Sequence, residues 1–420
     1  MMEVNKLAKL VVATVFLNVA NTQAAGFALI EHSASGMGNA FAGGGAVAED
    51  ASTVYFNPAG MTYVQGTQLV GAIHFIKPNA EFNNDGSIAG DYPGPAPARP
   101  LGNSGGDIGS LNFVPNIYFK MDLNENVKIG LGVNSPFGLK TEYDPHWLGR
   151  FLAIKSEIQT ININPSIAYK INNQLSVGAG ISAMWAQAEL TRAVNIGLAE
   201  SDVKIKGDDW GYGYNFGAIY QATPGTRISV AYRSKVNQHL EGDATFGSAL
   251  LAKSGSISAN TTLPETLSMS AFSRIGNQWD LMGDVTFTRW SQFKELRINY
   301  SNGTLLANTP ENWSNTLRYS IGANYHYNDA IKLRGGLAYD EEAISDQFRT
   351  ARIPGNDRKW VSMGANWKIQ PNASLDIGYA HLFINDATVS DNQVASGSGL
   401  IKGSYDGDVN ILSLQYTHNF

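Results

Sequence analysis

The amino-acid sequence predicts an all-β fold, a 14-stranded antiparallel transmembrane β-barrel that encloses an N-terminal, partly helical plug. Three observations predict it. Segments of alternating apolar and polar residues follow one another across residues 67–420. Short turns alternate with longer polar excursions between these segments, as in bacterial outer-membrane barrels. After the leader, no stretch of 18 uninterrupted apolar residues occurs, so a membrane-embedded chain would have to be a closed barrel.

Residues 1–24 have the pattern of a secretory signal peptide. Lys6 and Lys9 precede an apolar run over residues 10–17, and small residues follow at Ala20 and Ala24. The run is well short of the roughly 20 residues that a membrane-spanning helix needs, which disfavours the alternative of a membrane anchor. We therefore expect this leader to be cleaved on export.

Residues 25–66 are predicted to form the plug, or hatch. They are rich in Gly, Ala and Ser and lack the alternation of a strand, so they favour short helices and turns. Eight-stranded barrels are filled by their own side chains, whereas barrels of sixteen or more strands leave an open channel. A barrel of intermediate size could be closed by a segment of this length.

The barrel is predicted over residues 67–420. Turn signals recur roughly every 43 to 52 residues, for example at 124–126 and 172–173. They divide the chain into fourteen expected strands: 68–79, 111–121, 127–136, 157–170, 174–192, 204–221, 226–240, 261–275, 278–298, 313–327, 330–340, 358–369, 373–387 and 405–420. An even number of strands places both chain ends on one side of the membrane.

Composition narrows the possible functions. A net charge of -6 and the lack of a basic cluster argue against nucleic acid as a partner. The absence of Cys removes disulfides and thiolate metal sites, and the His residues lack metal-ligand spacing. We find no Gly-x-Ser-x-Gly, His-Glu-x-x-His or P-loop motif, so we expect neither an enzyme nor a cofactor. A general porin for polar solutes remains an alternative, because alternating strands fit it equally well.

The third expected strand is interrupted. It ends at Asn134 and is followed by Ser135, Pro136, Phe137 and Gly138. Proline lacks the N–H that a strand ladder needs and glycine relaxes the backbone, so pairing with a neighbouring strand should fail here. An ordinary strand end at the start of a loop is the alternative.

The following excursion carries a candidate ligand groove. Trp147, Leu148, Phe151 and Leu152 have the spacing of one apolar helix face. An apolar face on a loop outside the membrane needs a partner. We expect it to bind a hydrophobic ligand, and packing on the barrel rim is the alternative.

Several motifs together resemble the FadL family (FadL/TodX-like) of outer-membrane long-chain fatty acid and hydrocarbon transporters, over essentially the whole chain. They are Ala25-Gly26-Phe27, Ser35-Gly36-Met37-Gly38, Ala40-Phe41-Ala42-Gly43, Asn57-Pro58-Ala59 and Trp210-Gly211-Tyr212-Gly213-Tyr214-Asn215. The resemblance implies the outer membrane of a Gram-negative bacterium, a hatch inside the barrel, and a kinked third strand that opens the wall sideways. It also implies contact with membrane lipid and lipopolysaccharide, and recognition by the outer-membrane assembly machinery, which the terminal Phe420 would serve.

The resemblance also implies roles for particular residues. Phe27 would line the ligand pocket, and Asn57, Pro58 and Ala59 would contact the kinked strand at Pro136 and Gly138. Arg192 matches by position an arginine that in the family contacts the acidic head group of the ligand. The family's second basic residue is not evident in the matching region, residues 306–312. We favour passive uptake of long-chain fatty acids because Arg192 is present, with aromatic or alkane hydrocarbons as the alternative.

Overall fold

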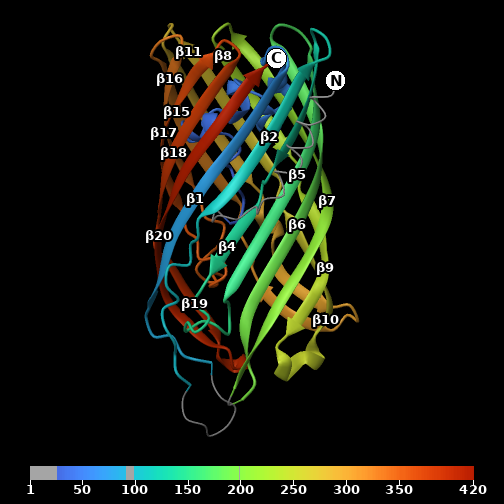
Figure 1. The fold of residues 1–420 in the computed structure, drawn as a ribbon, viewed down its shortest axis with the longest axis vertical. Coiled ribbons are helices and arrows are strands. Elements are labelled where there is room, and N and C mark those ends of the chain that lie inside the picture. Colours follow the sequence, from blue (N-terminus) through green and yellow to red (C-terminus); the bar gives the residue numbers. More distant parts are fainter. Residues whose placement is uncertain (1–25, 91–98, 198) are drawn as a thin grey trace.

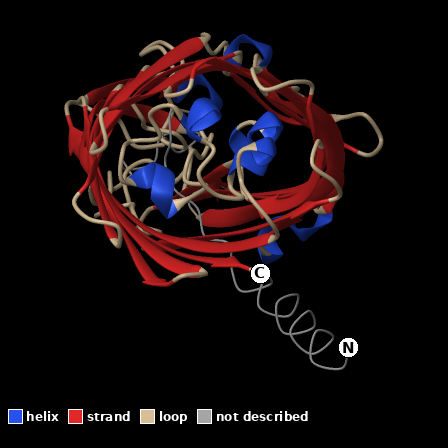
Figure 2. Cartoon of the chain, turned by 90° about the horizontal axis from the view of Figure 1, so that it is seen from above, coloured by secondary structure: helices blue, strands red, loops and turns tan. Residues whose placement is uncertain are grey.

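The computed structural model is a closed antiparallel β-barrel that holds the N-terminal segment in its lumen (Figures 1 and 2). It describes residues 26–90, 99–197 and 199–420, so the expected signal peptide lies outside the described residues. Twenty strand segments make up fourteen barrel strands, because six barrel strands are interrupted once. The first strand pairs with the last and thereby closes the barrel. The predicted fold class is confirmed.

Eight barrel strands are continuous. They are β1 (Gln68–Asn84), β2 (Asn112–Asp122), β5 (Lys155–Lys170), β6 (Leu175–Asn195), β7 (Glu200–Thr223), β16 (Ile331–Asp340), β17 (Arg358–Gln370) and β20 (Gly399–Asn419). The interrupted strands are β3 (Val127–Asn134) with β4 (Gly138–Glu142), β8 (Thr226–Arg233) with β9 (Val236–Phe246), β10 (Gly255–Leu263) with β11 (Thr266–Ile275), β12 (Trp279–Thr288) with β13 (Glu295–Tyr300), β14 (Leu305–Pro310) with β15 (Thr316–His326), and β18 (Ala373–Ile384) with β19 (Ala387–Gln393).

Strand alternation places apolar residues outside and polar residues inside. On β20, Leu412, Leu414 and Tyr416 are exposed on the outer surface, whereas Ser413 and Gln415 are buried. This is the reverse of a soluble protein and is the arrangement that lipid around a barrel requires. Short turns gather at the end of the barrel where the C-terminus lies, and the longer excursions gather at the opposite end, near β10 and β19 (Figure 1).

The helices in the described residues are short. Three α-helices and a 3-10 helix, all in the hatch, lie inside the ring of strands (Figure 2): α2 (Ala34–Met37), α3 (Gly44–Val47), α4 (Thr53–Phe56) and η1 (Pro58–Thr62). Three further 3-10 turns connect strands: η2 (Ser248–Lys253), η3 (Trp290–Gln292) and η4 (Val394–Ser396). None of the described helices has both the length and the apolar character needed to cross a membrane.

The hatch is bonded to the barrel wall. Asp50 accepts a hydrogen bond from Gln415 of β20 at 2.9 Å. Glu49 forms ion pairs with Lys332 and Arg334 of β16, and Arg334 also pairs with Asp376 of β18 at 2.7 Å. Burial opposes ionisation of Glu49, but the two cations prevail and lower its pKa to about 2. Glu49 is therefore ionised at neutral pH and holds the hatch against the wall.

A glycine in the barrel wall allows the hatch backbone to approach the wall closely. A Cβ atom added at Gly336 of β16 would lie 2.2 Å from the backbone of Asn39 in the hatch. Any larger residue at this position would push the hatch backbone away from the wall. Glycine in this strand is therefore required by the close approach of the two backbones.

Candidate ligand-binding and gating site

The strand pairing of the barrel wall is interrupted beside the third strand. β3 pairs with β2 on one side, from Lys128 to Val133, and with β5 on the other. Beyond the interruption, β4 pairs with β5 alone among the described strands. Residues 112–116 of β2 therefore pair with β1 but with no third-strand neighbour. The interruption predicted at Pro136 and Gly138 is confirmed, and it is no ordinary strand end because β4 continues along β5.

Side chains satisfy the backbone at the interruption. Thr160 of β5 accepts a hydrogen bond from the Phe137 N–H at 3.0 Å and donates its hydroxyl to the Phe137 carbonyl at 2.6 Å. Ser135 donates to the Thr160 carbonyl. These bonds replace the ladder bonds that β5 would otherwise exchange with the third strand, because buried backbone groups need partners.

The start of the hatch occupies the opening. The Leu29 N–H donates to the Pro136 carbonyl at 2.8 Å, and the Gly138 N–H donates to the Phe27 carbonyl at 2.8 Å. These two bonds flank Ala28 and Phe137, which form an antiparallel bridge. Residues 27–29 of the hatch therefore act as a short strand beside the kinked segment of the wall.

The hatch also reaches the far side of the opening. The Asn116 side chain of β2 donates to the Glu31 carbonyl at 2.8 Å. The Glu31 carboxylate accepts a hydrogen bond from the Ile30 N–H, and burial raises the pKa of Glu31 to about 6. Five hatch residues, 27–31, thus span the gap between the third strand and β2.

Phe27 stands at the centre of an aromatic cluster, which we call the aromatic barrier: Phe27, Phe137, Trp290, Phe293 and Trp313. The Phe27 ring lies 4.8 to 6.0 Å from the other four ring centroids. Phe27 is 2% exposed. Edge-to-face contacts of this kind add to the stabilisation from burial. The structure therefore places Phe27 in a closed packing contact, and Phe27 lines neither of the two cavities that flank this cluster.

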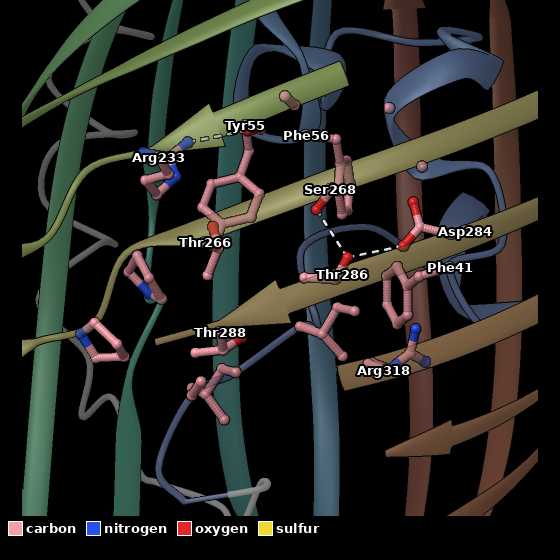
Figure 3. Close-up of a pocket in the computed structure, with 18 of the residues that line it drawn as sticks. Phe41, Tyr55, Phe56, Arg233, Thr266, Ser268, Asp284, Thr286, Thr288 and Arg318 are labelled. Carbon is pink, nitrogen blue, oxygen red and sulfur yellow. Dashed lines mark hydrogen bonds between the residues drawn. The ribbon is translucent and has the colours of Figure 1, made fainter. Parts of the chain in front are cut away.

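Two cavities flank the aromatic barrier. The lumen cavity, of about 140 Å³, is lined by Phe137 and Trp290 of the barrier and by hatch residues that include Leu29, Phe41 and Phe56 (Figure 3). The outer cavity, of about 610 Å³, is lined by Leu296, which packs against the barrier from the other side. The barrier therefore separates the extracellular loops from the lumen.

The outer cavity combines an apolar floor with arginines. Its apolar lining comes from the outer ends of β6, β7, β13 and β14: Leu190, Val194, Ile205, Leu296, Ile298 and Leu306. Arg192 lies on this cavity and donates to the Phe151 carbonyl at 3.2 Å. It does not pair with Glu189, which pairs instead with Lys155 and Lys204.

Arg352 is a second basic residue on the same cavity, and the sequence reasoning missed it. It lies in the excursion between β16 and β17 and donates to Ser156 at 2.9 Å and to the Leu152 carbonyl at 2.8 Å. Burial and then the nearby charge of Arg192 lower the pKa of Arg352 to about 10. The two arginines are thus close together, and neither forms an ion pair with the described residues, although Asp391 lines the same cavity. No strand pattern marks Arg352, because it lies on a loop.

The expected helical face over residues 147–152 is wrong. The segment is a series of turns, and Trp147 is fully buried, stacked on Tyr143 at 3.8 Å between ring centroids. Its indole N–H donates to the Ala153 carbonyl at 2.6 Å. Leu148 packs in the same cluster, whereas Phe151 and Leu152 line the outer cavity. Packing against the barrel, the alternative interpretation, therefore holds for the first two residues.

The segment Asn57-Pro58-Ala59 lies deeper in the barrel. The Asn57 side chain donates to the Gly45 carbonyl at 3.0 Å and to the Ala218 carbonyl of β7 at 3.3 Å, and it accepts from the Ala59 N–H. Pro58 lines the lumen cavity. η1 contacts β3, but the backbone bonds to Pro136 and Gly138 come from residues 27–29. Within the described residues, no His, Asp and Glu cluster could hold a metal ion.

Comparisons with known proteins agree with this geometry. Residues 15–420 match the family described as Outer membrane protein transport protein (OMPP1/FadL/TodX). Outer membrane protein P1 of Haemophilus influenzae (strain Rd) is 32% identical over 411 residues, 89% of each chain. The long-chain fatty acid transport protein of Escherichia coli (strain K12) is 30% identical over 413 residues, 86% of this chain and 89% of that protein.

Solved structures share the fold. A Pseudomonas aeruginosa FadL homologue superposes with a TM-score of 0.88 at 24% identity, over 94% of this chain and 100% of the homologue. The Pseudomonas putida toluene transporter TodX superposes with a TM-score of 0.71 at 16% identity, over 91% of this chain and 98% of TodX. The resemblance indicated by the sequence motifs is confirmed. The chain therefore belongs to the OMPP1/FadL/TodX family and is a transport protein of the Gram-negative outer membrane.

Proposed function

We propose that the chain mediates passive uptake of long-chain fatty acids. The substrate would enter the outer cavity, pass the aromatic barrier into the lumen cavity, and leave sideways between β2 and the kinked third strand. The observation that carries this route is the short backbone pairing of residues 27–29 with Pro136 and Gly138, which fills the opening in the wall.

The residues that line the lumen cavity support the proposed lateral exit. Ala28 and Leu29 of the hatch line it together with Pro136 and Phe137 of the kink. Withdrawal of the hatch start would break two backbone hydrogen bonds to the kink and join the cavity to the surrounding lipid. A hydrophobic molecule would then move from one apolar environment to another without crossing water. The movement also takes Phe27 out of the aromatic barrier, so barrier and exit would open together.

The outer cavity favours an amphiphilic substrate. Burying some 14 methylenes at about 0.8 kcal/mol each gives roughly 11 kcal/mol of gross driving force. A charge-assisted hydrogen bond from an arginine contributes about 1.5 to 3 kcal/mol. The acyl chain therefore supplies most of the affinity, and Arg192 and Arg352 select a carboxylate head group. Relatives described as long-chain fatty acid transport proteins, at 30 to 32% identity, support this substrate class.

Uptake of aromatic or alkane hydrocarbons is the second candidate. The family description includes TodX, and toluene transporters share the fold. Such substrates would use the same apolar route and gain nothing from the two arginines. A porin for polar solutes is disfavoured, because the hatch and the aromatic barrier fill the lumen.

Uptake of radiolabelled oleate and toluene tests the substrate class. The gene would be expressed in a strain that lacks its own fatty acid and toluene transporters, and both uptake rates would be compared with an empty-vector control. We expect oleate uptake well above the control and little change for toluene. Toluene uptake without oleate uptake would favour the hydrocarbon function, and failure of both would contradict the proposal.

A further inference from the structure

The lumen cavity has one polar wall. Cross-strand register places Arg233, Thr266, Thr288 and Thr316 in one row across β8, β11, β12 and β15. All four line the cavity. The next row toward the short turns contains Ser268, Thr286, Arg318 and Asp340, which line it too. Figure 3 labels Arg233, Thr266 and Thr288 of the first row and Ser268, Thr286 and Arg318 of the second.

The opposite side of the cavity is apolar. It is formed by the hatch and the kinked strand, with Leu29, Ile30, Phe41, Phe56 and Phe137 among its residues. A ligand in the cavity would therefore have a hydrocarbon surface on one flank and a hydroxyl surface on the other.

Much of the polar wall lacks hydrogen-bond partners. Ser268 bonds to Thr286, which donates to Asp284 at 2.8 Å. The hydroxyls of Thr266, Thr288 and Thr316 make no hydrogen bond with the described residues, although Thr316 is 4% exposed. Unpartnered hydroxyls in a row on one wall provide donors and acceptors that a ligand could use.

Arg318 adds further unused donors. One terminal nitrogen donates to the Ala40 carbonyl of the hatch at 3.0 Å. Its Nε and its other terminal nitrogen are buried without a partner. The side chain is 6% exposed and lines the cavity. The cost of such buried donors is reduced when a ligand oxygen accepts from them.

A plain acyl chain fits this wall poorly. Methylenes pressed against the threonine row would displace water and leave its hydroxyls without any partner, which is unfavourable. A second carboxylate is not favoured either, because the charged residues that line the cavity balance: two arginines, Arg233 and Arg318, and two carboxyl groups, Asp284 and Asp340. The group that matches the wall is neutral and both donates and accepts, which describes a hydroxyl.

We propose that the lumen cavity recognises a hydroxyl group on the acyl chain, so that hydroxylated long-chain fatty acids are preferred substrates. The proposal rests on the proposed uptake of fatty acids and narrows its substrate class. Thr288 and Thr316, adjacent in register on β12 and β15, would be the specificity-determining residues.

The test compares binding of octadecanoate with octadecanoates hydroxylated at carbon 3, 10 or 12. Affinities would be measured on the purified full-length protein in detergent. We expect at least one isomer to bind about tenfold more tightly than octadecanoate, which corresponds to about 1.4 kcal/mol. In the double variant Thr288→Val with Thr316→Val, this advantage should disappear while octadecanoate binds as tightly as before or more tightly.

Two controls keep the test decisive. Thr245→Val removes an exposed threonine from β9 and should change neither affinity. Thr288→Ser with Thr316→Ser keeps the hydroxyls and should keep the advantage, which separates their loss from a folding defect. If octadecanoate binds and no isomer binds more tightly, or if the valine variant weakens both ligands equally, the hydroxyl proposal is wrong. If neither ligand class binds the wild type, the proposed uptake of fatty acids fails instead.

Discussion

Arg192 and Arg352 are predicted to select the head group of the substrate. Both line the outer cavity, and their mutual repulsion would be relieved by a bound carboxylate. We expect Arg352→Gln to weaken oleate binding by roughly 10-fold to 100-fold, the range of one lost charge-assisted hydrogen bond. Arg192→Ala should have a similar effect. Equilibrium binding of oleate to the purified variants measures both.

A neutral ligand provides the control for the arginine variants. An alkane of similar length should bind Arg352→Gln as it binds the wild type, because burial of its chain is unchanged. Arg297→Gln, on the exposed outer end of β13, should leave both ligands unaffected. Equal losses for oleate and alkane would mean that the arginines shape the cavity and do not bind a head group.

The sequence predicts the role of some site residues and not of others. Arg192 was found because it matches a family position, although periodicity alone gives it no role. Arg352 was missed because its loop lies more than 150 residues away in the chain from Arg192, and only the fold brings the two together. Trp147 was misjudged because its helical spacing is also compatible with turns, and its stacking on Tyr143 depends on tertiary packing.

At the scale of the elements, an ion-pair cluster at Glu49 helps to hold the hatch against the barrel wall. Glu49 pairs with Lys332 and Arg334 of β16, and its pKa of about 2 lies below its ordinary value of 4.5. The stabilisation is therefore present above pH 4.5 and is lost as pH falls toward 2. We expect Glu49→Gln to loosen the hatch at neutral pH, since the buried Arg334 and the partly buried Lys332 lose a partner.

Ion conductance in planar bilayers measures hatch loosening. Glu49→Gln should give more frequent conducting events than the wild type at pH 7, and the wild type should approach the variant near pH 2 to 3. Glu241→Gln, which removes an exposed carboxylate from β9, serves as the matched control. Conductance equal to the wild type in Glu49→Gln would show that other contacts hold the hatch.

At the kinked strand, the sequence predicts the break in strand pairing but not the segment that fills the break. Pro136 and Gly138 predict failed pairing from local chemistry alone, and the structure confirms it. The partner that replaces the ladder could not be predicted, because residues 27–29 lie more than 100 positions away and have no strand pattern. Local sequence determines where a strand breaks, whereas long-range packing determines what fills the break.

At the scale of the whole molecule, the alternation of apolar and polar residues along the strands is the main observation that predicts the fold. The fourteen strands and their short turns follow from a pattern of period two, which lipid outside and polar groups inside both reinforce. The interruptions in β8/β9, β10/β11, β12/β13 and β14/β15 were not predicted. Residues at these breaks pack in one cluster with Trp290 and Trp313, and the sequence has no local signal for this packing.

The proposed route runs through the outer cavity, the aromatic barrier, the lumen cavity and the gap in strand pairing that the hatch start occupies. On the proposed route, hydrophobic cargo crosses only after the hatch start leaves the kink, because Phe27 packs in the barrier and residues 27–29 pair with the kinked segment. The chain contains no Cys, so a single disulfide can be introduced to hold this contact. Ala28 and Phe137 are suited to it because they face each other in an antiparallel bridge between two backbone hydrogen bonds.

Oleate uptake by the double variant Ala28→Cys with Phe137→Cys tests the lateral route most directly. A matched control pair, Asp243→Cys with Ser256→Cys, links β9 to β10 at exposed positions away from the kink. We predict that oxidation abolishes uptake in the first variant, that a reductant restores it, and that the control pair transports oleate in both states. Uptake that continues at the same rate with the hatch cross-linked to the kink would contradict a lateral exit through this opening.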